Sequence, residues 1–266
     1  MSDTIYALLL LAVTASATPQ RVMRSAALLL LAVTASATPP HIIFLLADDL
    51  GWNDVSFHGS SQIPTPNIDS LASKGIQLHN YYVDPVCSPT RASLMSGRSM
   101  LHTGIQTPYG AGDDASGLNL SYSLLPEHLQ RRFGYATAMI GKWHLGMKTA
   151  QYLPSSRGFD KFFGYYCGVM DYWKHYEDLG DHAHTALDLH EGGSGLGLAP
   201  GNDSAVYGTA GEYSTAMFAR KAASWIAEHS QVRPAQPFFL YLVRRRGHKV
   251  GSFGWTELCL LHPFAI

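Results

Sequence analysis

The chain has 266 residues, of which 46% are hydrophobic and 15% charged, and its 19 basic and 20 acidic side chains leave a formal net charge of -1. This composition excludes an intrinsically disordered chain, which has fewer apolar residues and a larger net charge. It also argues against a nucleic-acid partner, because such proteins normally carry a basic excess. Three cysteines are too few for a disulfide scaffold. What remains is a globular protein with enough chain for one large domain or two small ones.

A repeated apolar segment marks the start of the chain. Ala7 to Pro19 and Ala27 to Pro39 carry the same sequence, A-L-L-L-L-A-V-T-A-S-A-T-P. Each copy has an apolar core followed by Ala-Ser-Ala, the pattern of a secretory signal with its cleavage site. We predict a signal peptide that begins at Met23 and is cut near Ala37, so that residues 1–37 are a duplicated signal region. Each apolar run is far shorter than the roughly 20 residues of a membrane span, so no stable span is expected.

The first predicted element of the mature chain is a strand that leads directly into two carboxylates. His41 to Ala47 is a short, continuous apolar run, which is typical of a strand covered on both faces of a parallel sheet. Asp48 and Asp49 follow it, and open α/β sheets bind ligands at the carboxyl ends of their strands. We therefore expect these carboxylates to belong to a site. A short helix is predicted next, with Thr65 as its N-cap.

Helices and strands then alternate along the chain. A helix over Pro126–Phe133 precedes a strand over Tyr135–Ile140, and a helix from Tyr213 to about His229 precedes a strand over Pro237–Leu242. Between them, Gly180–Gly211 is rich in glycine and small polar residues and is predicted to be a long surface excursion. This order predicts an α/β fold, with a mainly parallel sheet sandwiched by helices.

Several histidines lie between Asp171 and His190, and they allow two interpretations. They could form a second metal site, or they could belong to a solvated loop. We favour the loop, because a spacing such as His182-x-His184 is weak evidence for a metal without cysteine or carboxylate partners.

The segment that carries most chemical information is Cys87 to Arg98, which reads C-S-P-T-R-A-S-L-M-S-G-R. Ser88 is a good N-cap and Pro89 suits the first helical position, so Cys87 should lie at the N-terminus of a short helix. A helix N-terminus favours an anionic group, and Arg91, one turn further on, can point toward the same place. From these residues alone, a buried free cysteine beside a surface arginine is an equally good interpretation.

The C-S-P-T-R run resembles the sulfatase signature, in which the cysteine of a Cys-x-Pro-Ser/Thr-Arg motif is oxidised to formylglycine. Other segments resemble sulfatases of the arylsulfatase B, I and J type in the same order: Leu45–Val55, Thr65–Ala72, Ser96–Arg98, Gly141–Gly146, Arg157–Asp160 and Pro237–Leu242. Several motifs in the family order are a strong signal, unlike one short motif. The resemblance implies an alkaline-phosphatase-like fold, with residues 38–242 forming an incomplete N-terminal sulfatase domain.

The resemblance also implies a nucleophile and a metal site. Cys87, as hydrated formylglycine, would attack the sulfur of a sulfate ester after modification by a formylglycine-generating enzyme. Asp48 and Asp49, with the modified Cys87, would bind a hard divalent cation, which in this family is usually calcium.

The remaining site residues implied by the resemblance carry charge or protons. Arg91 would hold the formylglycine hydroxyls, Lys142 would bind a sulfate oxygen, and His144 would hydrogen-bond the hydroxyls from the same extended segment. His248 lies at about the distance expected for the family's leaving-group histidine, although a chance histidine in an unrelated tail is as good an interpretation. Residues 243–266 resemble nothing in the family, and its later Asp-Asn pair and lysine have no match here. The resemblance therefore implies a truncated enzyme of low activity.

Three functions are consistent with these observations. The leading one is a sulfuric ester hydrolase that acts on aryl or sugar sulfates. A phosphatase or phosphonate hydrolase of the same superfamily is disfavoured by the cysteine, since those enzymes more often use serine or threonine. A non-catalytic secretory glycoprotein derived from a sulfatase is the third. The signal pattern predicts the secretory pathway, with a lysosomal or extracellular destination, and triplets at Asn119 and Asn202 are candidate glycosylation sites.

Overall fold

The computed structural model describes residues 39–109, 117–178 and 185–245. Contacts divide the chain into one unit that ends at Pro39 and a second that starts at Pro40, and all of the helices and strands named here belong to the second unit. The predicted signal region, residues 1–37, lies outside the described residues. Among the helices that are described, none has the length and apolar character needed to cross a membrane.

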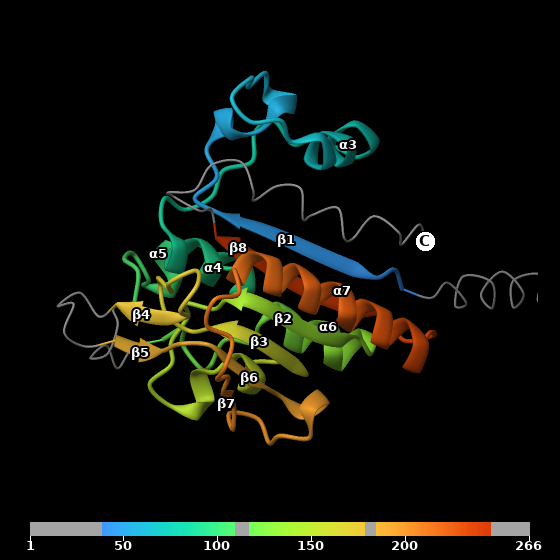
Figure 1. Ribbon diagram of the computed structural model, residues 1–266. Coiled ribbons are helices and arrows are strands. Elements are labelled where there is room, and N and C mark those ends of the chain that lie inside the picture. The colour runs from blue at the N-terminus through green and yellow to red at the C-terminus, as the bar shows by residue number, and fades with distance from the viewer. Residues whose placement is uncertain (1–38, 110–116, 179–184, 246–266) are drawn as a thin grey trace, which may run out of the picture. The chain divides into compact units, whose positions relative to one another are not determined.

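A six-stranded sheet forms the centre of the unit, in the order β1-β8-β2-β3-β6-β7 (Figure 1). Its four parallel strands are β1 (Ile42–Asp48), β8 (Phe238–Arg245), β2 (Ala136–Lys142) and β3 (Lys161–Tyr165). Two short antiparallel strands extend it, β6 (His190–Gly192) and β7 (Ser204–Ala205). The mainly parallel sheet is therefore confirmed.

Helices cover both faces of this sheet. α7 (Ser214–Val232) covers one face, and α4 (Cys87–Ser96) and α6 (Leu125–Phe133) cover the other, with the single turn α5 (Met100–Thr103) after α4. Helix α3 (Pro66–Lys74) does not cover the sheet and packs against the 3₁₀ turn over Ser56–His58. Short 3₁₀ turns connect the elements: η1 (Trp52–Asp54), η2 (Ser56–His58), η3 (Ala150–Tyr152), η4 (Pro154–Ser156) and η5 (Ser194–Leu196). Figure 1 shows α7 running along the sheet beside β8 and β2.

Alternation along β8 explains why two separate cores form. Because successive side chains of a strand point to opposite faces, Phe238, Leu240 and Leu242 pack in the cluster that includes Met217 and Trp225 of α7. The intervening residues Phe239, Tyr241 and Val243 pack on the other face, in the cluster that includes Ala92 and Met95 of α4. A strand that is apolar at every position is thus buried on both sides, and the predicted helical sandwich is confirmed.

Two predictions were wrong: that the first strand is covered on both faces, and that the segment after Gly180 is an irregular surface loop. β1 is covered on one face only, since Ile43 and Leu45 are 41% and 39% exposed. It lies at the edge of the described sheet, and α7 covers β8, β2 and β3 instead.

The predicted surface excursion after Gly180 contains β5 (Thr185–Leu187), which pairs with β4 (Tyr176–Asp178), as well as β6 and β7. Partner strands, rather than local apolar patterning, determine these short strands.

Candidate active site

The carboxyl ends of β1 and β2 carry two of the predicted site residues. Asp48 is the last residue of β1 and Lys142 the last residue of β2, with β8 between the two strands. Both side chains are buried, and Lys142 Nζ lies 3.0 Å from Asp48 Oδ2. Because parallel strands end at the same edge of a sheet, residues 94 positions apart form this ion pair.

Helix α4 brings Arg91 to the same ion pair. Arg91 is 1% exposed, and its Nη2 donates to Asp48 Oδ1 at 2.9 Å. Its Nη1 donates to the backbone carbonyl of Lys142 at 2.7 Å and lies 3.5 Å from the hydroxyl of Tyr241 on β8. The guanidinium therefore joins α4 to the ends of β1 and β2 and approaches the middle of β8.

Cys87 is the first residue of α4, as predicted, but the cap differs from the prediction. Val86 is the N-cap residue, and no side chain caps the helix. Ser88 lies inside the first turn, where its hydroxyl donates to the carbonyl of His144 at 2.9 Å and accepts from the backbone N–H of Tyr109. The serine could not be recognised as a tertiary contact from sequence, because its partners lie 56 and 21 residues away. Cys87 itself is half-buried and has a free thiol.

The charges of this cluster do not cancel. Asp48 lies between two buried cations, so the cluster of Asp48, Arg91 and Lys142 has an excess positive charge. Burial alone would raise the pKa of the Asp48 carboxyl, but the charges and hydrogen bonds of Arg91 and Lys142 outweigh burial and lower it. The excess positive charge adjoins the N-terminal turn of α4, whose unpaired amides also favour an anion. The arrangement is suited to a buried oxyanion.

His144 is held beside this cluster in a strained backbone conformation. We had predicted an extended segment after β2. The φ of His144 is +56°, so the chain turns into the left-handed region there instead. Its Nε2 donates to the carbonyl of Tyr109 at 2.9 Å, which leaves Nδ1 as an acceptor. Nδ1 is buried and has no partner among the described residues. A buried acceptor in this state can receive a hydrogen bond from a hydroxyl group.

The electrostatics of His144 predict an acid-sensitive fold. Burial, followed by the charge of Lys142, lowers its pKa to about 4, whereas an unfolded histidine titrates near 6.5. The unfolded state therefore binds a proton first, and stability is lost as the pH falls from about 6.5 toward 4, by about 3 kcal/mol in total. Urea unfolding at about pH 7 and about pH 4.5 measures this loss. His144→Gln should remove it, and an unchanged loss in that variant would contradict the assignment.

The described residues do not complete a calcium site. Both Asp48 oxygens are engaged by cations, and the neighbouring Asp49 is exposed. No third His, Cys, Asp or Glu joins them in a metal-holding group within the described ranges. Calcium takes six to eight oxygen ligands, so Asp48, Asp49 and residue 87 satisfy only part of its coordination.

The other sequence-predicted residues have different outcomes. His248 lies outside the described residues. Thr65 does not cap α3 with its side chain; its hydroxyl donates to Asp69 and accepts the backbone N–H of Ser56, which fixes the turn before that helix. Tyr241 was missed as a site neighbour, although its position inside a predicted strand that ends at the same edge was a usable signal.

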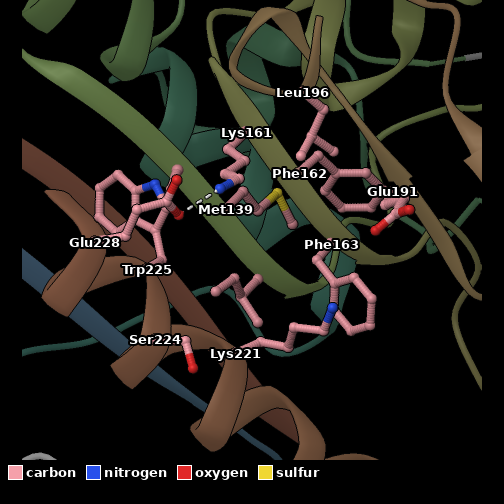
Figure 2. Close-up of a pocket in the computed structure, with 12 residues that line it drawn as sticks. Met139, Lys161, Phe162, Phe163, Glu191, Leu196, Lys221, Ser224, Trp225 and Glu228 are labelled. Atoms are coloured by element: carbon pink, nitrogen blue, oxygen red, sulfur yellow. Dashed lines mark hydrogen bonds and ion pairs between the residues drawn. The ribbon is translucent and has the colours of Figure 1, made fainter. Parts of the chain in front are cut away.

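A separate cavity lies on the α7 face of the sheet (Figure 2). It has a volume of about 220 Å³ and is lined by apolar side chains of β2 and β3, together with the ion pair between Lys161 and Glu228 at 2.9 Å. Figure 2 shows Trp225 and Glu228 of α7 beside Lys161. None of the predicted site residues lines this cavity. Lys161 begins β3, whereas the cationic cluster lies at the carboxyl ends of the strands.

Comparisons with known proteins agree with the geometry. A family model described as Sulfatase matches residues 40–254. Arylsulfatase J of Mus musculus is 39% identical over 210 residues, which are 79% of this chain and 32% of that protein. N-acetylgalactosamine-6-sulfatase of Homo sapiens is 39% identical over 133 residues, 47% of this chain and 25% of that protein. The crystal structure of Ps i-CgsB superposes with a TM-score of 0.63 at 30% identity, covering 79% of this chain and 46% of that one. The chain thus spans less than half of each of these proteins.

Proposed function

Because the chain belongs to the sulfatase family, whose model matches residues 40–254, we propose that it carries the nucleophile and the cationic cluster of a sulfate ester hydrolase. The observation that supports this most directly is the buried triad of Asp48, Arg91 and Lys142, which adjoins the N-terminal turn of α4, where Cys87 lies. Cys87 begins a Cys-Ser-Pro-Thr-Arg sequence and is accessible enough to be modified.

The described residues suit a formylglycine at position 87. When present, its hydrated aldehyde supplies a hydroxyl nucleophile for sulfur and a second hydroxyl that helps to release sulfate. His144 Nδ1, the buried acceptor without a partner in the described ranges, would receive a hydrogen bond from one of these hydroxyls. The Ser88 hydrogen bond to the His144 carbonyl keeps the two segments together.

The cations in this proposal act on the sulfate oxygens. Arg91 and Lys142 offset the negative charge that develops as the ester bond breaks, and Asp48 holds both side chains in place before substrate arrives. For a divalent cation, for which calcium is our expectation, Asp49 would be one ligand, and Asp48 could join it only by giving up an ion pair with Arg91 or Lys142. A preorganised cationic cluster stabilises a transition state without having to rearrange during the reaction.

We propose an aryl or sugar sulfate as substrate. N-acetylgalactosamine-6-sulfatase, one of the relatives, is named for a sulfated sugar. A phosphatase or phosphonate hydrolase is the second candidate, because a cationic cluster also suits phosphate, but a cysteine in this motif favours sulfate over the serine or threonine usual there. The repeated signal pattern before residue 38 supports the secretory pathway, where the formylglycine-generating enzyme would meet the chain.

Expression of the full chain through a secretory pathway tests the nucleophile. We expect mass spectrometry to find formylglycine in the peptide that contains Cys87, and to find an unmodified thiol in the peptide that contains Cys167, which lacks the motif. Pro89→Ala should abolish the modification, because it breaks the motif without removing the cysteine. An intact Cys87 thiol throughout would support a non-catalytic glycoprotein instead.

A further inference from the structure

A second group of reactive side chains contains none of the catalytic candidates. Cys167 follows β3, Glu177 lies in β4, and Asp188 follows β5. These three side chains are only 5%, 6% and 4% exposed. One ligand atom from each, the sulfur of Cys167 and a carboxylate oxygen from each acid, lies within 4.8 Å of the other two. Three segments of the chain therefore direct three acidic groups into one buried point.

No lysine or arginine of the described residues pairs with the acids of this cluster. Asp188 accepts backbone N–H groups of Tyr166 and Cys167 at 3.0 and 2.9 Å, and the basic group beside it is the imidazole of His190. The Cys167 thiol donates to the sulfur of Met147 at 3.3 Å. Burial raises the pKa of the Glu177 carboxyl to about 7, and the charge of Asp188 adds to this. Two buried carboxyl groups without a lysine or arginine partner are unfavourable when ionised, since buried charges are normally paired or coordinate metals.

We propose that Cys167, Glu177 and Asp188 form a binding site for one zinc ion. Sulfur combined with carboxylate oxygen is a donor set for Zn²⁺, whereas calcium and magnesium take oxygen ligands. Three protein ligands leave one of the four tetrahedral positions for water. On binding, the Cys167 Sγ–H bond breaks, its electron pair forms the Zn–S bond, and the proton passes to solvent. His190, with Nε2 3.4 Å from Asp188 Oδ1, lies where it can orient that ligand.

The proposed site differs from the sequence-based preference for a solvated loop in this region. The histidines alone were weak evidence for a metal, but Cys167, Glu177 and Asp188 supply the cysteine and carboxylates that the spacing lacked. The zinc ion would connect the β4–β5 hairpin to the end of β3. It would also fix the segment under His144, whose backbone N–H donates to the Tyr166 carbonyl at 3.0 Å and whose ring lies against Gly168. The proposal stands independently of the sulfatase activity.

Cobalt binding to the purified, chelator-treated full chain tests the site. Co²⁺ bound to a thiolate gives a sulfur-to-cobalt charge-transfer absorption, so we expect this band to saturate at one Co²⁺ per chain and to disappear when Zn²⁺ is added. Cys167→Ser should remove the band, while the matched variant Cys87→Ser should keep it. Zn²⁺ should also raise the melting temperature of the unaltered chain, because it binds only the folded state.

Two further variants make the test independent of the cysteine. Glu177→Gln and Asp188→Asn keep the size of each side chain and remove one charged ligand, so each should weaken Zn²⁺ binding by on the order of tenfold or more. Far-UV circular dichroism identifies any variant that does not fold. Absence of the charge-transfer band in the unaltered chain would overturn the proposal, as would a band that survives in folded Cys167→Ser.

Discussion

Replacing Asp48 with alanine should destabilise the fold by about 3–5 kcal/mol, the cost of removing one partner from a buried ion pair. The variant leaves Arg91 and Lys142 buried and close together without a carboxylate between them. Two like charges in a medium of low dielectric repel strongly, and neither side chain can reach water without moving α4 or the end of β2. Urea unfolding at neutral pH measures the loss.

The adjacent carboxylate provides the matched control. Asp49 is exposed and has a left-handed φ of 59°, which asparagine tolerates, so Asp49→Asn should change stability by no more than about 0.5 kcal/mol. The lowered pKa of Asp48 also fixes the sign of the pH dependence. Its stabilisation is complete above the unfolded value of about 3.9 and is lost as the pH falls through the lower folded value. Equal losses for Asp48→Ala and Asp49→Asn would show that Asp48 is not the centre of a buried cluster.

The sequence was sufficient to predict the central strands and their helices. The runs that became β2 and β8 are apolar at most positions, and Phe238–Val243 of β8 is apolar throughout, so only a strand with helices on both faces buries these side chains. Glycines that follow α4 and α6, Gly97 and Gly134, mark the ends of both helices because they adopt left-handed φ values of 66° and 68°. These signals are local, so no tertiary information was needed to find them.

Features that depend on distant partners could not be predicted in the same way. The apolar pattern of β1 is that of a buried strand, yet its exposure depends on which strands and helices lie beside it. The two-residue β7 exists only because it pairs with β6. Family motifs identified Asp48, Arg91 and Lys142, but the ion pairs join residues 43 and 94 positions apart. The sequence therefore identified the residues of the cluster, and only the fold shows which of their atoms form the ion pairs.

The same limit applies to the buried acids near β4. Glu177 and Asp188 lie in a segment that reads as polar, and Cys167 lies in one that reads as a glycine-rich turn. Nothing in their spacing indicates that their side chains are buried together. They meet because β4 and β5 form a hairpin whose register aligns Tyr176 with Leu187, which places both acids beside the end of β3.

Gly141→Ala should be as damaging as loss of Asp48, for a reason that concerns the backbone alone. Gly141 has a φ of +107°, and a Cβ there would lie 2.1 Å from the carbonyl oxygen of Val243 on β8. Backbone strain of about 1–2 kcal/mol adds to about 1–3 kcal/mol for displacing the neighbouring strand, so we expect a loss of about 2–5 kcal/mol in urea unfolding.

Gly134→Ala separates these two causes. Gly134 has a φ of +68°, but a Cβ there meets nothing within 4 Å, so this variant should cost only the strain of about 1–2 kcal/mol. Lys142 directly follows Gly141, and displacement of that strand end would move its amine away from Asp48. Gly141→Ala should therefore also weaken the acid dependence that comes from Asp48, whereas Gly134→Ala should preserve it. Similar losses for both variants would mean that β2 and β8 tolerate separation at this point, and that the cationic cluster does not depend on a close approach of the two strands.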